Sequence, residues 1–276
     1  MKKVLLFAKR NLTEMIRDPL LYIFCLGFPV MMVAMFNIIL HYTPDGETPI
    51  FYEKSLTPGI MIFGFSLLML MSSLLVSKDR QSAFLKRLFS SPLKPYQFIL
   101  GYLLPFGLIG IVQMIVGIAS GYISGVISGR GFVDFGSACL LFLEMLPMMI
   151  INCALGMLFG TLLNDKSSPA ICSIFVSASG IIGGAWMPID KMGGFETACG
   201  YLPFYESVYL GRCITGATHT PTDLESIMNP AVYSFADRGV LYLCLYLAYA
   251  SFFHSEKINL FLVSFWFFLQ LSNPNS

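Results

Sequence analysis

The side chains that most often perform catalysis or bind metals are scattered along this sequence. His41, His219 and His254 lie far apart, and no HExxH or other metal-ligand spacing accompanies them. The seven cysteines form no CxxC pair, and neither GxSxG nor the phosphate loop GxxxxGK[ST] occurs. We therefore expect a chain that is not an enzyme, binds no metal or cofactor of its own, and cannot hydrolyse ATP by the phosphate-loop route.

Glu144 is the ionisable residue that falls well inside an apolar stretch. A carboxylate at membrane depth costs a few kcal/mol unless it is protonated, paired or hydrated, so Glu144 is a candidate intramembrane polar site. In one interpretation it couples an ion gradient to transport. In the other it only reaches water or pairs with Arg130, because it lies about two turns from the end of its stretch. An ion-coupled transporter also predicts inverted repeats, and an intramembrane enzyme predicts a paired nucleophile and base; the sequence shows neither.

Composition places the chain in lipid. Hydrophobic residues make up 56% of it and charged residues only 12%, whereas a soluble domain carries roughly twice that charged fraction. The net charge of +1 argues against nucleic acid as a partner, because phosphate binding needs a surplus of basic residues on one face.

The apolar stretches predict an all-α polytopic membrane protein. A helix needs about 20 apolar residues to cross the hydrocarbon core, and six stretches meet or approach that length. We expect a single membrane domain over residues 1–257, followed by an apolar tail, 258–276, that lies in the interface, forms a hairpin with the sixth span, or adds a seventh. The six stretches are 20–40, 58–77, 98–127, 138–163, 169–188 and 239–253.

The basic residues predict that both ends of this domain lie in the cytoplasm. Loops rich in Lys and Arg are retained there, and this orientation places most of the 17 Lys and Arg residues inside. The exceptions are Lys54, Arg130, Lys191, Arg212 and Arg238.

Two segments at the predicted cytoplasmic surface have helical patterns. Residues 3–17 alternate an apolar side, including Val4, Leu5 and Ala8, with a charged one that includes Arg10. This pattern is typical of a helix lying in the headgroup layer or of a basic end that only sets topology. The loop 79–93 carries a second apolar stripe flanked by cations, suited to a groove on a partner protein or to the membrane surface. Its candidate coupling residues are Asp79, Arg80, Phe84, Leu85, Lys86, Arg87, Leu88 and Pro92.

Glycines at spacings of four predict close helix packing within the membrane, where small residues let backbones approach. Beyond the fifth span, the outer segment 189–238 begins with a half-apolar part that predicts a short helix or re-entrant element. Cys199 and Cys213 in this segment are expected to form a disulfide or to remain two thiols. The candidate packing residues are Gly117, Gly121, Gly125, Gly156 and Gly160.

The order of these parts resembles the permease subunit of type-2 ATP-binding-cassette (ABC) transporters, in particular multidrug and antibiotic exporters. The stretch DRQSAFLKRLFSSPLKPYQFILGYLLP, from Asp79 to Pro105, is similar to the family's charged pair, LxxSPL turn and entry into the third span. Two further motifs are similar to those that lead into the family's outer segment: GGAWMP at 183–188 and YLPF at 201–204. The resemblance covers about residues 1–257.

The resemblance implies two permease chains, as a homodimer or heterodimer, joined to two ATPase subunits that bind ATP and Mg²⁺. Residues 79–93 would then dock on the ATPase, 3–17 would form the connecting helix, and 189–216 the outer re-entrant helices. It also implies a bacterial plasma-membrane exporter of an amphipathic drug, lipid, peptide or glycan. Two departures are the loop residues 81–83, QSA, where the family has acidic and glycine positions, and the apolar tail.

Overall fold

The computed structural model describes the chain as a bundle of helices. Four helices are long and apolar enough to cross a membrane, and a shorter apolar helix accompanies them. Within the described ranges there is no β-strand, so the predicted all-α membrane class is confirmed for this part of the chain. The predicted span 239–253, the tail 258–276 and the predicted coupling residues 84–92 lie outside these ranges. The described residues are 2–42, 49–81, 95–129, 133–164, 166–187, 189, 192–200 and 202–217.

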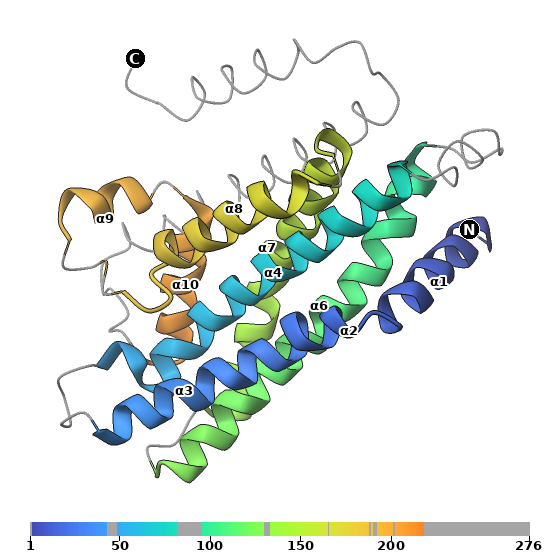
Figure 1. Cartoon of the computed structure of the whole chain (residues 1–276). Helices are drawn as coiled ribbons and strands as arrows, with labels where there is room; N and C mark the ends of the chain where they lie inside the picture. Colours follow the sequence, from blue (N-terminus) through green and yellow to red (C-terminus); the bar gives the residue numbers. More distant parts are fainter. Residues whose placement is uncertain are drawn as a thin grey trace.

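The long helices run side by side (Figure 1). After α1 (Lys2–Ile16), the first span combines α2 (Pro19–Leu21), a π-helical segment (Tyr22–Gly27) and α3 (Phe28–Tyr42). A short 3-10 turn (Pro49–Phe51) precedes α4 (Glu53–Gln81), which is followed by α6 (Pro95–Ile127), α7 (Phe135–Leu162) and the shorter α8 (Ser168–Ile182). Two small helices, α9 (Gly194–Cys199) and α10 (Pro203–Ile214), lie at one end.

Local sequence explains where the first and fourth of these spans begin. Asp18 accepts a hydrogen bond from the Leu20 amide at 3.0 Å, and Pro19 follows at the first helical position. Asp134 caps α7 in the same way by accepting hydrogen bonds from the Gly136 amide and the Ser137 hydroxyl. The π-helical segment directly precedes Pro29, which lacks the amide that a regular helix would use there.

Helix α4 forms the centre of the bundle. It contacts α7 most extensively and also packs on α8, α6, α10 and α3. Of the 18 most apolar consecutive residues of α4, 78% are buried, whereas the corresponding share for the first span is 28%. The first span therefore presents most of its surface outward, whereas α4 belongs to the core.

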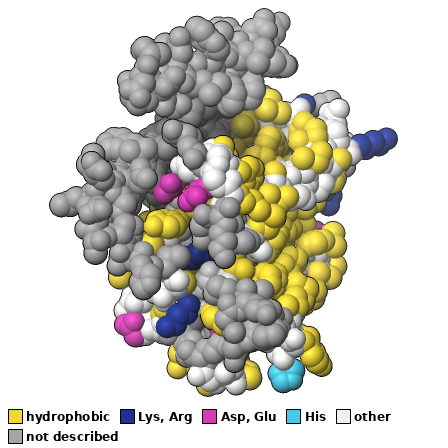
Figure 2. All heavy atoms as spheres, turned by 90° about the vertical axis from the view of Figure 1, so that its left-hand side faces the viewer, with side chains coloured by type: hydrophobic (Ala, Val, Ile, Leu, Met, Phe, Trp, Pro, Cys, Tyr) yellow, Lys and Arg dark blue, Asp and Glu magenta, His cyan; other side chains and the backbone are white. Residues whose placement is uncertain are grey.

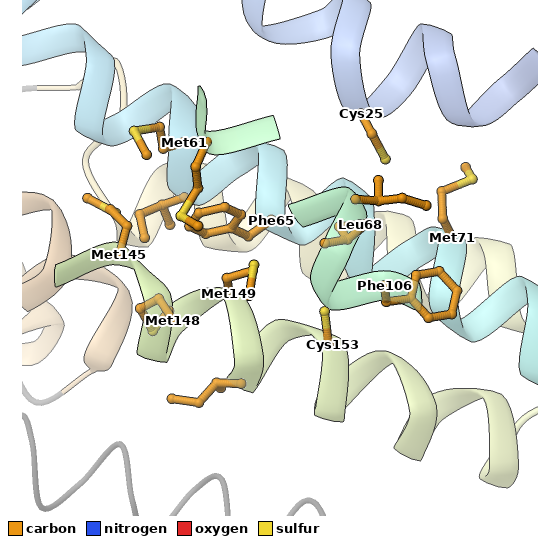
Figure 3. Close-up of a cluster of buried hydrophobic side chains, with 14 of the residues drawn as sticks. Cys25, Met61, Phe65, Leu68, Met71, Phe106, Met145, Met148, Met149 and Cys153 are labelled. Carbon is orange, nitrogen blue, oxygen red and sulfur yellow. The ribbon is translucent and has the colours of Figure 1, made fainter. Parts of the chain in front are cut away.

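The core between α4 and α7 is rich in methionine (Figure 3). Met61, Phe65 and Leu68 from α4 meet Met145 and Met149 from α7, and all five are buried. Unbranched, polarizable methionine side chains fill irregular gaps and adapt to small shifts of their neighbours. This contact is therefore well packed and able to repack.

Small residues bring α4 close to its neighbours on two sides. A methyl group at Gly156 of α7 would overlap the Ser72 hydroxyl and the Met69 carbonyl, and one at Gly160 would lie 2.7 Å from the Ser73 carbonyl oxygen. On the α8 side, hydroxyl pairs join Ser66 to Ser179 and Ser73 to Ser168, each at 2.6 Å. The predicted packing glycines of α6 also lie inward: a methyl group at Gly117 would touch Met61 at 3.2 Å, and Gly121 and Gly125 are buried.

The outer surface matches a lipid environment. Figure 2 shows hydrophobic side chains gathered on the right-hand part of the described surface, with few charges among them. Large apolar side chains of α3 contribute to the exposed surface, with Met31 at 66% and Ile38 at 61% exposure. Such a continuous apolar surface is stable in a bilayer and would be a liability in water.

Gly156→Ala tests the close approach of α7 to α4. Because the added methyl group meets a backbone carbonyl that cannot rotate away, we expect the variant to lose about 1–3 kcal/mol of unfolding free energy, measured by denaturant titration in detergent. Gly107→Ala is the matched control, since nothing lies within 4 Å of a methyl group there and alanine favours the helix. Equal stability of the two variants would contradict this packing.

Candidate functional site

A buried carboxylate lies at the last turn of α4, just before the residues 82–94, which lie outside the described ranges. The Asp79 side chain is 4% exposed and accepts two hydrogen bonds from the Arg10 guanidinium, at 2.8 and 3.2 Å. The Tyr102 hydroxyl of α6 donates a third at 2.7 Å. One carboxylate thus joins α1, α4 and α6.

Helix α1 is held in place by the face that it turns to α6. Phe7 stacks on Phe98 with ring centroids 5.5 Å apart and meets the edge of Tyr102 at 5.1 Å. Its ring occupies the space that a side chain at position 101 would need, which explains the glycine there. One turn on, the Asn11 amide donates to the Gly101 carbonyl at 3.1 Å.

The buried face of α1 differs from the one predicted. The sequence pattern placed Leu5 on the apolar side and Arg10 on the opposite, solvated side. In the structure Leu5 is 61% exposed, and Arg10 turns inward to Asp79. The reason is that burying the Asp79 carboxylate requires a cation, and Arg10 supplies one only when Phe7 and Asn11 face α6.

The electrostatics of this pair favour the charged form of Arg10. Burial alone would lower the pKa of Arg10, but the hydrogen bond and the charge of Asp79 raise it above its ordinary value. The bidentate geometry adds strength, because two parallel charge-assisted hydrogen bonds form. Glu14 extends the cluster outward through Arg10 at 2.7 Å and Lys78 at 3.9 Å, contacts that are partly exposed and therefore weak.

Among the predicted coupling residues, Asp79 and Arg80 fall in the described part of the chain. Asp79 is buried and Arg80 is exposed beside it. Sequence reasoning missed Arg10, Asn11 and Tyr102 as partners of Asp79. Asn11 was the available signal, because an amide on the apolar side of a helix must find a hydrogen-bond partner.

A second polar cluster fixes the opposite end of the bundle. The buried Arg212 guanidinium of α10 donates to the Ser55 carbonyl at 3.1 Å and to the Gly184 carbonyl at 2.6 Å. Glu53, at the first turn of α4, accepts from the Ser128 hydroxyl at 2.8 Å. This cluster ties α10 to the start of α4 and to the end of α8.

Glu144 belongs to this same end. Its carboxylate accepts a hydrogen bond from the Ser207 hydroxyl of α10 at 2.8 Å, and the residue is partly buried. The partner predicted for it from the sequence, Arg130, lies outside the described residues. In the outer segment that was predicted over 189–238, Cys199 and Cys213 are both free thiols, so the structure does not join them in a disulfide.

Metal binding finds no support in the described helices. No group of three or more His, Cys, Asp or Glu side chains there is arranged to hold a metal ion. The two polar clusters join helices through hydrogen bonds and charge.

A double-mutant cycle measures the Asp79–Arg10 pair. Asp79→Asn and Arg10→Gln keep the side-chain size while removing charge, and each should lower the unfolding free energy. Removal of one partner of a buried pair costs about 3–5 kcal/mol, but Arg10 is 37% exposed and solvent screens it. We therefore expect a coupling energy of about 1–2 kcal/mol between the two sites. Strictly additive losses, by contrast, would show that the pair contributes nothing.

One comparison with known proteins identifies a family. Residues 36–215 match the ABC-2 family transporter protein, which amounts to 180 of the 276 residues. The match includes all four long apolar helices in whole or in part, the loop that follows Asp79, and α10. A search of curated proteins finds no match.

Proposed function

The chain belongs to the ABC-2 transporter family, and on that premise we propose that it is the membrane-spanning subunit of an ATP-driven exporter. Membership makes it a multi-pass membrane protein and the membrane component of an ABC transporter assembly, in which catalysis belongs to an ATPase partner. We further propose six spans, a cytoplasmic N-terminus in a bacterial plasma membrane, and pairing with a second permease chain. ATP and Mg²⁺ would bind to the partner.

The buried Asp79 cluster is the observation that carries this proposal. It lies at the end of α4, directly before the segment 82–94, whose Phe84 and Leu88 would dock on the ATPase. A force on this segment acts first on the last turn of α4. Because Asp79 is bonded to Arg10 and Tyr102, that force would reach α1 and α6 at the same time.

The bundle offers a route for such a displacement. Helix α4 contacts α3, α6, α7, α8 and α10. Its methionine-rich face against α7 tolerates small shifts without leaving voids. Its hydroxyl pairs to α8 are short and local, so they can exchange partners as the helices slide. A substrate pocket between moving helices would then bind the substrate differently in two states, as transport requires.

The charges of the described helix ends support the proposed orientation. Of the basic residues near the ends of the long helices, Lys78, Arg80 and Lys166 lie at the end of the bundle that holds the Asp79 cluster, against Lys54 at the opposite end, where Glu53 and Asp134 also lie. Basic residues are retained on the cytoplasmic side. The Asp79 end would therefore face the cytoplasm, where an ATPase is available.

The substrate class follows from the setting. An export pathway through an apolar bundle that is open to lipid suits an amphipathic molecule, whether drug, lipid, peptide or glycan. Polar side chains at membrane depth in the described helices are mostly Ser, Thr, Asn and Gln, which orient a ligand without binding a fixed charge. An ion is a poorer fit to such a lining.

Phe84→Asp with Leu88→Asp tests ATPase docking. Charges at these apolar positions should prevent burial against the partner, so we expect an ATPase with a phosphate loop to co-purify with the wild type and to be lost from the double variant. Phe195→Asp is the control, because Phe195 of α9 is exposed at the opposite end of the bundle. Retention of the ATPase by the double variant, at normal membrane levels, would refute the docking assignment.

Glu144→Gln separates this proposal from the ion-coupled alternative, which family membership does not favour. A glutamine oxygen can still accept the Ser207 hydrogen bond, so we expect ATP-driven transport into vesicles to remain within about twofold of the wild type. Complete loss of transport in a normally folded variant would revive Glu144 as an ion-coupling site.

A further inference from the structure

A cavity of about 390 Å³ opens at the elbow between α1 and the first span. Its floor is apolar and includes Met15, Leu21 and Phe106, whereas Arg17 and Lys78 stand at its rim. The first span begins at Pro19. The floor therefore lies at the depth where acyl chains begin, and the rim lies at the level of lipid headgroups.

The elbow is a preformed feature of the fold. Helix α1 ends at Ile16, and the Asp18 cap with Pro19 starts a new helix. Met15 and Leu21, on either side of the turn, are 4% and 5% exposed and belong to the main core cluster. The turn is thus anchored on both sides by the main core.

The rim offers two cations to a ligand. The rim also carries two carboxylates: Glu14 pairs with Arg10 at 2.7 Å, and Asp18 accepts a hydrogen bond from the Leu20 amide at 3.0 Å and points its charge at the start of the helix. Arg17 is exposed and forms no ion pair among the described residues. The Lys78 side chain is 69% exposed, and its ion pair with Glu14 is long, at 3.9 Å. Its ammonium group can therefore turn toward an anion at the rim.

From this arrangement we propose that the elbow cavity binds a phospholipid with an anionic headgroup. Its phosphate contacts Arg17 and Lys78, and one acyl chain lies along the floor. The surrounding surface is already suited to lipid, since Ile16, Leu20 and Ile23 beside the elbow are 49%, 47% and 58% exposed. A soluble phosphate would satisfy the two cations but leave the apolar floor empty.

The position of this site links the membrane to the Asp79 cluster. Lys78 precedes Asp79 by one residue, and Glu14 bonds to Arg10, which holds Asp79. A lipid that engages Lys78 and Arg17 therefore braces the elbow on which α1 depends. The choice of leaflet depends on the orientation given in the proposed function. The existence of the site does not depend on that orientation.

Native mass spectrometry of the purified full-length chain tests the lipid site directly. Phosphatidylglycerol and phosphatidylcholine with identical acyl chains are titrated against the wild type, and we expect the anionic lipid to be retained preferentially. Glycerol 3-phosphate, which represents the headgroup without chains, should not displace it. Equal retention of both lipids, or displacement by glycerol 3-phosphate at equal concentration, would overturn the proposal.

Removal of the charges at the rim is the second test of the lipid site. In Arg17→Gln with Lys78→Gln, retention of phosphatidylglycerol should fall roughly tenfold or more, since each basic residue near an anionic lipid contributes a factor of about five. Lys9→Gln with Lys166→Gln is the matched control, because both residues are exposed and neither lines the cavity. An equal fall in both double variants would mean general surface charge instead of a site. Neither arm uses an ATPase or transport, so failure here is distinguishable from failure of the proposed exporter function.

Discussion

The burial of the Asp79 carboxylate is the constraint on which the arrangement of this protein depends. A charge removed from water must be matched by a cation and by hydrogen-bond donors, or the folded state loses several kcal/mol. Arg10 and Tyr102 supply these groups from two other helices. The need to bring them together fixes which side of α1 faces the bundle, why Phe7 packs where residue 101 is glycine, and how the elbow at Pro19 is placed.

Helix α4 carries a buried acidic residue near each end, Glu53 and Asp79, both 3% exposed. Between them its contacts are small residues, hydroxyl pairs and methionines, which is the packing expected where lipid provides no hydrophobic force between helices. The ends are therefore held by bonds to charged side chains, and the middle by close packing and neutral hydroxyl pairs. Such a helix can transmit a displacement along its axis while its flanks repack, as the exporter proposal requires.

The sequence was sufficient to predict the long apolar helices, because their signal is local. The stretches predicted at 58–77 and 98–127 correspond to α4 at Glu53–Gln81 and α6 at Pro95–Ile127. The Asp79–Arg10 pair was beyond that reasoning, because its residues are 69 positions apart and nothing in either local pattern refers to the other. The same holds for Arg212, which the topology rule treats only as an outer charge but which the fold buries against two carbonyl groups.

The distance between α1 and the end of α4 tests most directly whether Asp79 holds these helices together. Spin labels at Lys9 and Arg80, both exposed, would report this distance by pulsed electron paramagnetic resonance, in a background whose accessible cysteines are replaced. We expect a single narrow distribution in the otherwise wild-type chain and a broad one in Asp79→Asn. A broad distribution in the wild-type background, or one that stays narrow without the Asp79 charge, would contradict the role assigned to this carboxylate.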